Sequence, residues 1–240
     1  SCKMYEIPEG RRATKGKSIM NFLSMTADEH VTSVLAVRKD EWEGDWGLMM
    51  VTREGIAKKS DAAAFKDVRR SGLIGITLKG DDKLIGARFV GKGDEVMLVS
   101  ASGQAIRFKE SDVRLMGRTA AGVSAMKLGK NDVIVSADVL KKGDKEREVL
   151  VVMEKGFGKT TSAKEYKVQK RSGSGIKTAK VTDKTGKIVG AAVVSGEERQ
   201  EGELVVMSSK GQVIKLSLKD VPNLGRQTQG VRVMKLRPGD

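Results

Sequence analysis

Two short strings in this sequence could bind nucleotide phosphates, because each ends in Gly-Lys followed by a hydroxyl side chain. They occupy residues 16–18 and 158–160. A phosphate-binding P-loop has four residues between a first glycine and the Gly-Lys pair, and it connects a strand to a helix. Gly10 lies one residue too far from the first string, and Met153 occupies the required position before the second. The spacing therefore argues against a nucleotide site at either string.

Acid–base and metal chemistry lack their usual side chains here. His30 is the one histidine and Cys2 the one cysteine, which excludes His/Cys metal clusters and a Ser-His-Asp arrangement. The carboxylates are scattered, with no pairing of an acid and a base. We expect His30 in a surface loop, and we expect packing roles for Tyr5, Tyr166, Trp42 and Trp46. The chain is therefore not expected to be an enzyme on its own, nor to hold a cofactor or metal.

Cations beside glycines form the clearest chemical pattern. Five similar segments open with Lys or Arg next to a glycine, and four hairpin-like segments carry Lys or Arg shortly after a turn glycine. Because equivalent positions in a repeat array lie at equivalent radii, these cations predict a basic band around the molecule. We expect double-stranded DNA to contact them through its phosphates. The candidate DNA-binding residues are Arg12, Lys15, Lys17, Lys58, Lys59, Arg69, Arg70, Arg107, Lys109, Arg118, Lys159, Lys170, Arg171, Lys177, Lys215, Arg226 and Arg232.

The overall charge supports a polyanionic partner. Lys and Arg total 45 against 31 Asp and Glu, giving a net charge of +14. A surplus of this size can also serve solubility alone, but a charge that keeps the period of the repeat favours phosphate binding. The single cysteine permits no intramolecular disulfide, which fits a reducing cytoplasm, and no apolar run is long enough to cross a membrane.

Self-similarity organises the chain. The basic segments contain Gly16, Gly72, Gly122, Gly175 and Gly230, which recur about every 50 to 56 residues. A second glycine follows inside each unit, in the turn of a β-rich hairpin pattern. These turn glycines are Gly55, Gly103, Gly156 and Gly211. The two markers keep phase over four copies, which indicates a true repeat.

Each unit is predicted to contain four strands and no long helix. In the third unit we expect strands at residues 123–128, 133–140, 148–154 and 159–168, from their alternation and β-branched side chains. Short strands at this period predict an all-β, propeller-like single domain over residues 1–240, in which neighbouring blades supply the core. The expected units are 11–68, 69–116, 117–169 and 170–224, with partial units at 1–10 and 225–240.

The string Phe-Lys-Glu-Ser-Asp-Val-Arg-Leu-Met-Gly-Arg-Thr-Ala-Ala-Gly-Val at residues 108–123 resembles the C-terminal domain of the DNA gyrase A subunit. So do residues 3–23, 81–103 and 225–233, in order along essentially the whole chain. The resemblance implies a β-pinwheel with strands exchanged between adjacent blades, six of them in the complete family domain. It also implies chiral wrapping of DNA around the outer edge in support of ATP-dependent negative supercoiling, with the cleaving tyrosine, ATP and Mg²⁺ in other parts of the enzyme.

The same resemblance implies a bacterial, nucleoid-associated location and a monomeric isolated domain. Its implied partners in the holoenzyme are the rest of the gyrase A subunit together with the gyrase B subunit. The basic box that marks gyrase in this family is absent from the string and is expected upstream of residue 1. The related domain of the topoisomerase IV A subunit, which typically lacks the box, therefore stays an alternative. A protein-interaction propeller with a solubilising charge is a second alternative, and an enzyme with its site in the central channel is a third.

Overall fold

Four β-hairpins dominate the computed structural model, which describes residues 6–10, 17–22, 25, 29–37, 44–66, 68, 72–144 and 146–237. The hairpins are β1 (Gly47–Thr52) with β2 (Ile56–Asp61), β4 (Glu95–Ser100) with β5 (Gln104–Lys109), β8 (Arg147–Met153) with β9 (Phe157–Ser162), and β13 (Glu203–Met207) with β14 (Val213–Ser217). They coincide with the four predicted hairpin segments. All four turn glycines have positive φ, from 74° to 87°, which explains why glycine recurs there.

Each hairpin ends in a short 3₁₀ helix. These helices are η4 (Ala62–Phe65), η5 (Glu110–Asp112), η6 (Ala163–Glu165) and η7 (Leu218–Asp220). In the third unit, the predicted fourth strand 159–168 therefore ends early, because the Ser162 side chain accepts a hydrogen bond from the Lys164 amide and starts η6. The other helical elements of the described chain are η2 (Ile19–Asn21) and α1 (Gly196–Glu201), the latter with a Ser195–Glu198 capping box.

The sheets are assembled by strand exchange. Each hairpin of the first three sheets pairs on one side with a strand that follows it in sequence, namely β3 (Leu84–Val90), β7 (Ile134–Leu140) and β12 (Ile188–Ser195). On its other side it pairs with a short strand from much later in the chain. These exchanged strands are β6 (Val123–Ser124), β11 (Ile176–Lys177) and β15 (Val231–Arg232), and β10 (Val168–Gln169) also pairs with β5.

The repeat unit of the sequence is therefore not a single sheet. The strands of unit 117–169 belong to three different sheets, because β6 joins β2, β7 joins β4, and β8–β9 form their own hairpin. The predicted strand at residues 123–128 is a strand only at Val123–Ser124, where it meets β2. The strand exchange implied by the family resemblance is confirmed.

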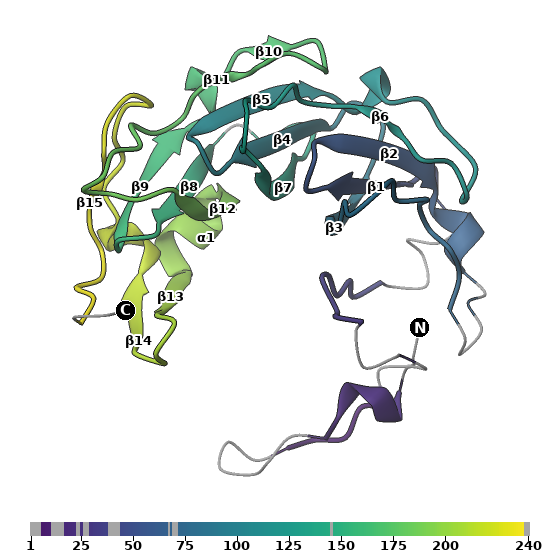
Figure 1. Ribbon diagram of the computed structural model, residues 1–240, viewed down its shortest axis with the longest axis horizontal. Helices are drawn as coiled ribbons and strands as arrows, with labels where there is room; N and C mark the ends of the chain where they lie inside the picture. The colour runs from purple at the N-terminus through teal and green to yellow at the C-terminus, as the bar shows by residue number, and fades with distance from the viewer. Residues whose placement is uncertain are drawn as a thin grey trace.

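The sheets follow one another around an arc (Figure 1). In this view β3, β7 and β12 lie toward the inside of the arc, the hairpins lie in the middle, and the exchanged strands β6, β11 and β15 lie along the outside. The all-β, propeller-like prediction is thus confirmed for the described chain. The outer edge is formed by the segments that contain the first glycine marker.

The core lies between neighbouring sheets. Leu98 and Ile106 face the cluster shared with the first sheet, whereas Met97 and Val99 on the same hairpin face the cluster shared with the third. Successive side chains of a strand point to opposite faces, so a hairpin between two others must be apolar on both faces. This explains the nearly continuous apolar runs in the first strands of the hairpins, such as Val96–Val99 in β4.

The last hairpin differs from the other three. β13 and β14 pair only with each other, and Val205, Met207 and Val213 are 58%, 67% and 53% exposed. The equivalents of Val205 on the second and third hairpins, Met97 and Leu150, are buried. One apolar face of β13–β14 is therefore uncovered.

Candidate nucleic-acid interface

Four stretches on the outer edge carry the first glycine marker and are here called the rim segments. They are residues 72–77, 118–127, 171–180 and 226–235, and the last three contain the exchanged strands. Each of these three crosses the turn of a hairpin that lies far upstream in sequence. Figure 1 shows them at the periphery of the arc.

Close backbone contacts fix each crossing. A Cβ on Gly122, Gly175 or Gly230 would lie 2.5–2.8 Å from a carbonyl oxygen of the hairpin. In the other direction, the carbonyl of the hairpin's turn glycine accepts hydrogen bonds from two consecutive rim amides, as Gly156 does from Val233 and Met234 at 2.9 and 3.0 Å. The two glycine markers keep phase in the sequence because they meet in space.

Neighbouring rim segments are also joined to each other. The amide five residues after one rim glycine donates to the carbonyl two residues before the next rim glycine. This bond recurs as Thr77 N to Ala120 O at 3.3 Å, Lys127 N to Gly173 O at 2.9 Å and Lys180 N to Thr228 O at 3.0 Å. The outer edge is thus one hydrogen-bonded band that runs across the sheets.

Arginines of the predicted site strengthen this band from within. Arg171 donates to Asp112 O and Ser124 O, both at 2.8 Å. Arg226 takes the same position one segment later, donating to Lys177 O at 3.0 Å with its Nε 3.8 Å from Glu165 Oε2. Both guanidinium groups are half-buried, so they are less available to phosphate than the sequence pattern predicts.

Two lysines of the predicted site are fully buried, which corrects the expectation that they line a DNA path. Lys58 and Lys159 are both 0% exposed. Lys159 Nζ donates to Gly225 O at 2.6 Å, Arg226 O at 2.9 Å and Thr228 Oγ1 at 3.1 Å. Lys58 Nζ donates to Gly75 O at 2.5 Å and to Arg118 O. The second P-loop-like string thus contains a lysine that holds backbone carbonyls rather than a phosphate.

Burial sets the titration of these lysines. Desolvation lowers the pKa of Lys159 to about 8, with Glu165 opposing and Arg226 adding to the shift. Desolvation also lowers the pKa of Lys58, and the charge of Arg118 acts in the same direction. A buried ammonium has lost the hydration that a surface lysine keeps, and its hydrogen bonds to carbonyl oxygens offset this loss only in part.

Lys59 and Arg107 are held in ion pairs. Lys59 pairs with the Glu110 carboxylate, and its ammonium also donates to Glu110 O at 3.2 Å. Arg107 Nε donates to Glu95 Oε2 at 2.6 Å, and its NH1 donates to Ala163 O at 2.8 Å. Both side chains are mostly buried. They join neighbouring sheets and are not free cations of the surface.

The remaining described candidates do lie at the surface. The exposed members of the predicted set are Lys17, Lys109, Arg118, Lys170, Lys177, Lys215 and Arg232. Two of them have acidic neighbours, since Lys170 lies 3.7 Å from Asp112 and Lys215 lies 2.7 Å from Glu203. Arg12, Lys15, Arg69 and Arg70 lie outside the described residues.

Three exposed lysines of the rim segments are not among the predicted cations. Lys127, Lys180 and Lys235 stand five residues after three successive rim glycines, and all are exposed. Their period is visible in the sequence, but each stands five residues from its glycine and so does not belong to the pattern of cations beside it. With Lys177 and Arg232 they give the band its outward positive charge.

The other singled-out side chains have packing or surface positions where they are described. Tyr166 is buried, its hydroxyl contacts Thr178 Oγ1, and burial raises the pKa of its phenol. Trp46 is half-buried, with Lys141 Nζ 4.7 Å from its ring centre, and His30 is exposed. Tyr5, Cys2 and Trp42 lie outside the described residues. Within the described ranges, no group of three or more His, Cys, Asp or Glu could hold a metal, and no helix could span a membrane.

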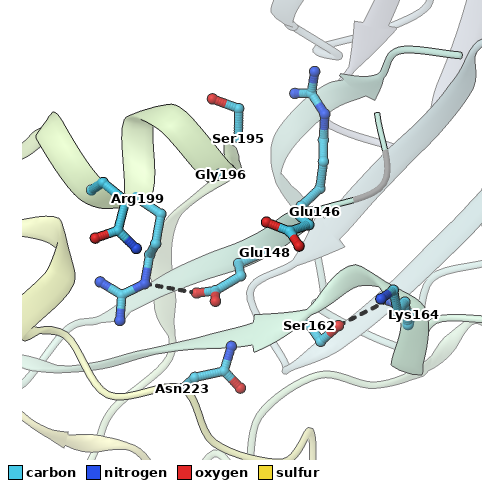
Figure 2. Close-up of a pocket in the computed structure, with 10 residues that line it drawn as sticks. Glu146, Glu148, Ser162, Lys164, Ser195, Gly196, Arg199 and Asn223 are labelled. Atoms are coloured by element: carbon cyan, nitrogen blue, oxygen red, sulfur yellow. Dashed lines mark hydrogen bonds and ion pairs between the residues drawn. The ribbon is translucent and has the colours of Figure 1, made fainter. Parts of the chain in front are cut away.

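One hollow of about 390 Å³ lies between β8, β9 and α1 (Figure 2). Its carboxylate Glu148 lies 3.1 Å from Arg199 Nε, and Arg199 also donates to Val221 O at 2.6 Å. The hydroxyls of Ser162 and Ser195 accept the capping hydrogen bonds of η6 and α1. The two Arg199 contacts therefore join the third sheet to the segment that follows the last hairpin.

Comparison with known proteins points to one family. A family model described as DNA gyrase C-terminal domain, beta-propeller, matches residues 1–38, 48–90, 94–141, 147–195 and 202–240. Four of these stretches begin within one residue of the start of β1, β4, β8 or β13. The repeat recognised in the family therefore starts at the hairpin.

Relatives and solved structures agree. The DNA gyrase A subunit of Staphylococcus epidermidis is 40% identical over 99% of this chain, and that of Lawsonia intracellularis is 39% identical over the same share. The chain spans 26% and 28% of the length of these two relatives. A crystal structure of the C-terminal domain of DNA topoisomerase IV superposes with a TM-score of 0.85 at 25% identity, covering 98% of this chain and 71% of that one. The structure of a DNA gyrase A C-terminal domain gives 0.79 at 26% identity, covering 94% and 73%.

Proposed function

We propose that this chain, which belongs to the DNA gyrase C-terminal domain family, binds double-stranded DNA along its rim segments without reading the base sequence. One observation carries the proposal. The rim segments form a single hydrogen-bonded band on the outer edge, and exposed cations recur along it at the period of the repeat. A regular row of cations on a convex edge suits the phosphate backbone of a bent duplex.

Bending the duplex costs free energy that phosphate contacts can offset. DNA has a persistence length of about 50 nm, and bending a short site costs roughly 1–6 kcal/mol. Phosphate contacts along a curved basic edge offset this cost without base-specific hydrogen bonds. Binding of this kind weakens steeply with salt, because each neutralised phosphate releases condensed counterions.

Family membership supports a wider role for the chain. We propose that the chain is the DNA-wrapping part of a gyrase A subunit. In that role it supports ATP-dependent negative supercoiling together with the gyrase B subunit. On this proposal it has no catalytic residues, cofactor or metal of its own, and ATP and Mg²⁺ act in other parts of the holoenzyme. It works in the bacterial cytoplasm at the nucleoid, and the isolated domain is monomeric.

The topoisomerase IV A subunit is the second candidate for the parent protein. Its support is the TM-score of 0.85 with a topoisomerase IV C-terminal domain. The gyrase assignment has the stronger support in sequence, with 40% identity to a gyrase A subunit over 99% of the chain. On either assignment, the proposed DNA contacts are the same rim segments of this chain.

A charge-matched pair of variants tests DNA binding by the rim. The variant Lys127→Gln/Lys180→Gln/Lys235→Gln removes three rim cations. The control Lys92→Gln/Lys142→Gln/Lys187→Gln removes three exposed lysines that flank the inner strands β3, β7 and β12. Binding to a fluorescent linear duplex would be measured across a salt series. The rim variant should bind more weakly, and its salt slope should fall by up to about 0.9 for each lost contact.

An equal loss of affinity in both triple variants would mean that DNA binding depends on net charge and not on the rim segments. Undetectable binding of the parent chain at low salt would end the DNA proposal altogether.

Topoisomer analysis tests wrapping separately from binding. Relaxed nicked plasmid would be saturated with the chain, sealed with ligase and deproteinised. Chiral wrapping shifts the linking-number distribution in proportion to the bound protein, whereas bending without handedness leaves its centre in place. A centred distribution despite tight binding would contradict chiral wrapping by this chain.

A further inference from the structure

Two of the four hairpins place a lysine where the other two place an isoleucine. The position is the third after the turn glycine, occupied by Lys58 in β2, Ile106 in β5, Lys159 in β9 and Ile214 in β14. Lys58, Ile106 and Lys159 are all 0% exposed. A buried ammonium pays a desolvation cost that isoleucine does not, so filling the core does not explain these lysines.

Their hydrogen bonds show what the lysines hold. Both ammonium groups donate to the carbonyl of the arginine that opens the rim segment crossing their own sheet, Arg118 for Lys58 and Arg226 for Lys159. These two arginines stand at the same place, four residues before the rim glycine. Lys159 also holds Gly225 and Thr228, so its three protons have three acceptors.

The held segment in turn places exposed cations. Thr228, which accepts from Lys159 through its hydroxyl, accepts through its carbonyl from the Lys180 amide at 3.0 Å. The same segment continues into β15, which carries Arg232. Lys180 and Arg232 are both exposed on the outer edge. One buried lysine therefore fixes the backbone beneath two surface cations from adjacent rim segments.

We propose that Lys58 and Lys159 are positioning residues for DNA binding: each pins a rim segment to its sheet so that the cations above it keep the spacing of the phosphates. The inference rests on the proposed function and extends it to residues that do not touch DNA. A flexible rim would bind DNA only after ordering its segments, and pinning removes that cost in advance.

The chain supplies its own test substitution. Lys159→Ile copies the buried Ile106 of the neighbouring hairpin, and Lys92→Ile removes one exposed lysine as the charge-matched control. Amide hydrogen exchange would be measured without DNA. In Lys159→Ile the amides of Lys180, Val233 and Met234 should exchange faster, while those of Ala125 and Met126, which meet the first hairpin, keep their rates. Lys58→Ile should show the reverse pattern.

DNA affinity then separates positioning from a merely structural role. Lys159→Ile should bind a linear duplex about 3- to 10-fold more weakly than Lys92→Ile, without a fall in global stability. A double-mutant cycle adds Lys180→Gln/Arg232→Gln. If Lys159 acts through these cations, its substitution should cost little further affinity once they are gone.

Three outcomes count against the inference. Equal affinities of Lys159→Ile and Lys92→Ile would overturn it while the proposed function stands, and so would fully additive effects in the cycle. A parent chain that fails to bind DNA at low salt would instead remove the proposed function and the inference with it.

Discussion

Lysine has two different roles in this chain, and the role depends on whether the residue lies on a hairpin strand or on a rim segment. Lys127, Lys180 and Lys235 project from the outer band, whereas Lys58 and Lys159 are enclosed by backbone carbonyls. All are phased with the glycine markers, so phase does not separate the two groups. Their roles diverge because Lys58 and Lys159 lie on hairpin strands that a rim segment covers, whereas the other three lie on the rim segments themselves, beyond the exchanged strands.

The pH dependence of unfolding should report the buried lysine. The pKa of Lys159 is about 8 in the folded chain, against 10.5 for an exposed lysine. Between these values the unfolded chain binds a proton that the folded chain has released, so this group makes the unfolding free energy rise with pH. Relative to Lys159→Ile, the parent should gain roughly 3 kcal/mol between pH 7 and pH 11, from about 1.4 kcal/mol per unit.

Urea unfolding of both proteins over this pH range measures the difference. A parent-minus-variant difference that stays flat, or that falls as the pH rises, would show that Lys159 titrates normally. Lys92→Ile is the control, because its exposed side chain should add no pH-dependent term.

At the scale of elements, the crossing of a hairpin turn by a rim segment is the repeated unit of construction. The two backbones approach so closely at the crossing that a Cβ on Gly156 would overlap Met234 O. The crossing accounts for both glycine markers. It also explains why the exchanged strands are short: two paired residues are enough when the carbonyl of the turn glycine accepts hydrogen bonds from two further amides.

Alanine at two equivalent turns should separate strain from collision. Gly156 and Gly211 both have positive φ, 74° and 81°, but a Cβ on Gly156 would lie 2.2 Å from Met234 O, whereas one on Gly211 meets nothing within 4 Å. Gly211→Ala should cost about 1 kcal/mol, as expected for the backbone conformation. Gly156→Ala should cost at least about 2 kcal/mol more, because it displaces the exchanged strand. Denaturant unfolding measures both, and equal costs would contradict the crossing.

At the scale of the whole molecule, stability comes from contacts between sheets, so the end of the arc is built differently from its middle. Each inner hairpin contributes to two apolar clusters, whereas β13–β14 packs on one side against Leu150 and Val194. Val205 and Leu150 occupy equivalent hairpin positions, yet the first is 58% exposed and the second 6%.

Matched threonine substitutions should expose this asymmetry. Leu150→Thr should lower the unfolding free energy by about 2–4 kcal/mol, because it removes packed methyl groups and buries a hydroxyl. Val205→Thr should change it by less than about 0.5 kcal/mol, as at an ordinary surface site. Thermal or urea unfolding compares them. A comparable loss at Val205 would mean that another surface covers this face in solution.

The sequence by itself determined the repeat, its β character and the hairpins, because these depend on local signals: alternation, β-branched side chains and turn glycines with positive φ. It also determined the positive charge and its period. The predicted strand boundaries failed where a local competitor intervened, as at Ser162, whose hydroxyl caps a 3₁₀ helix in place of further strand.

Only the tertiary structure decided which strands share a sheet and which cations face solvent. The strands of residues 117–169 are divided among three sheets, and pairing across such distances leaves no mark in local periodicity. The same pairing turns Lys159 inward onto Arg226 and leaves Arg232 outside. The partner of each cation is set by backbone that arrives from far along the chain. The predicted basic band is therefore divided into two layers, an inner one whose cations hold the rim backbone and an outer one whose cations are exposed.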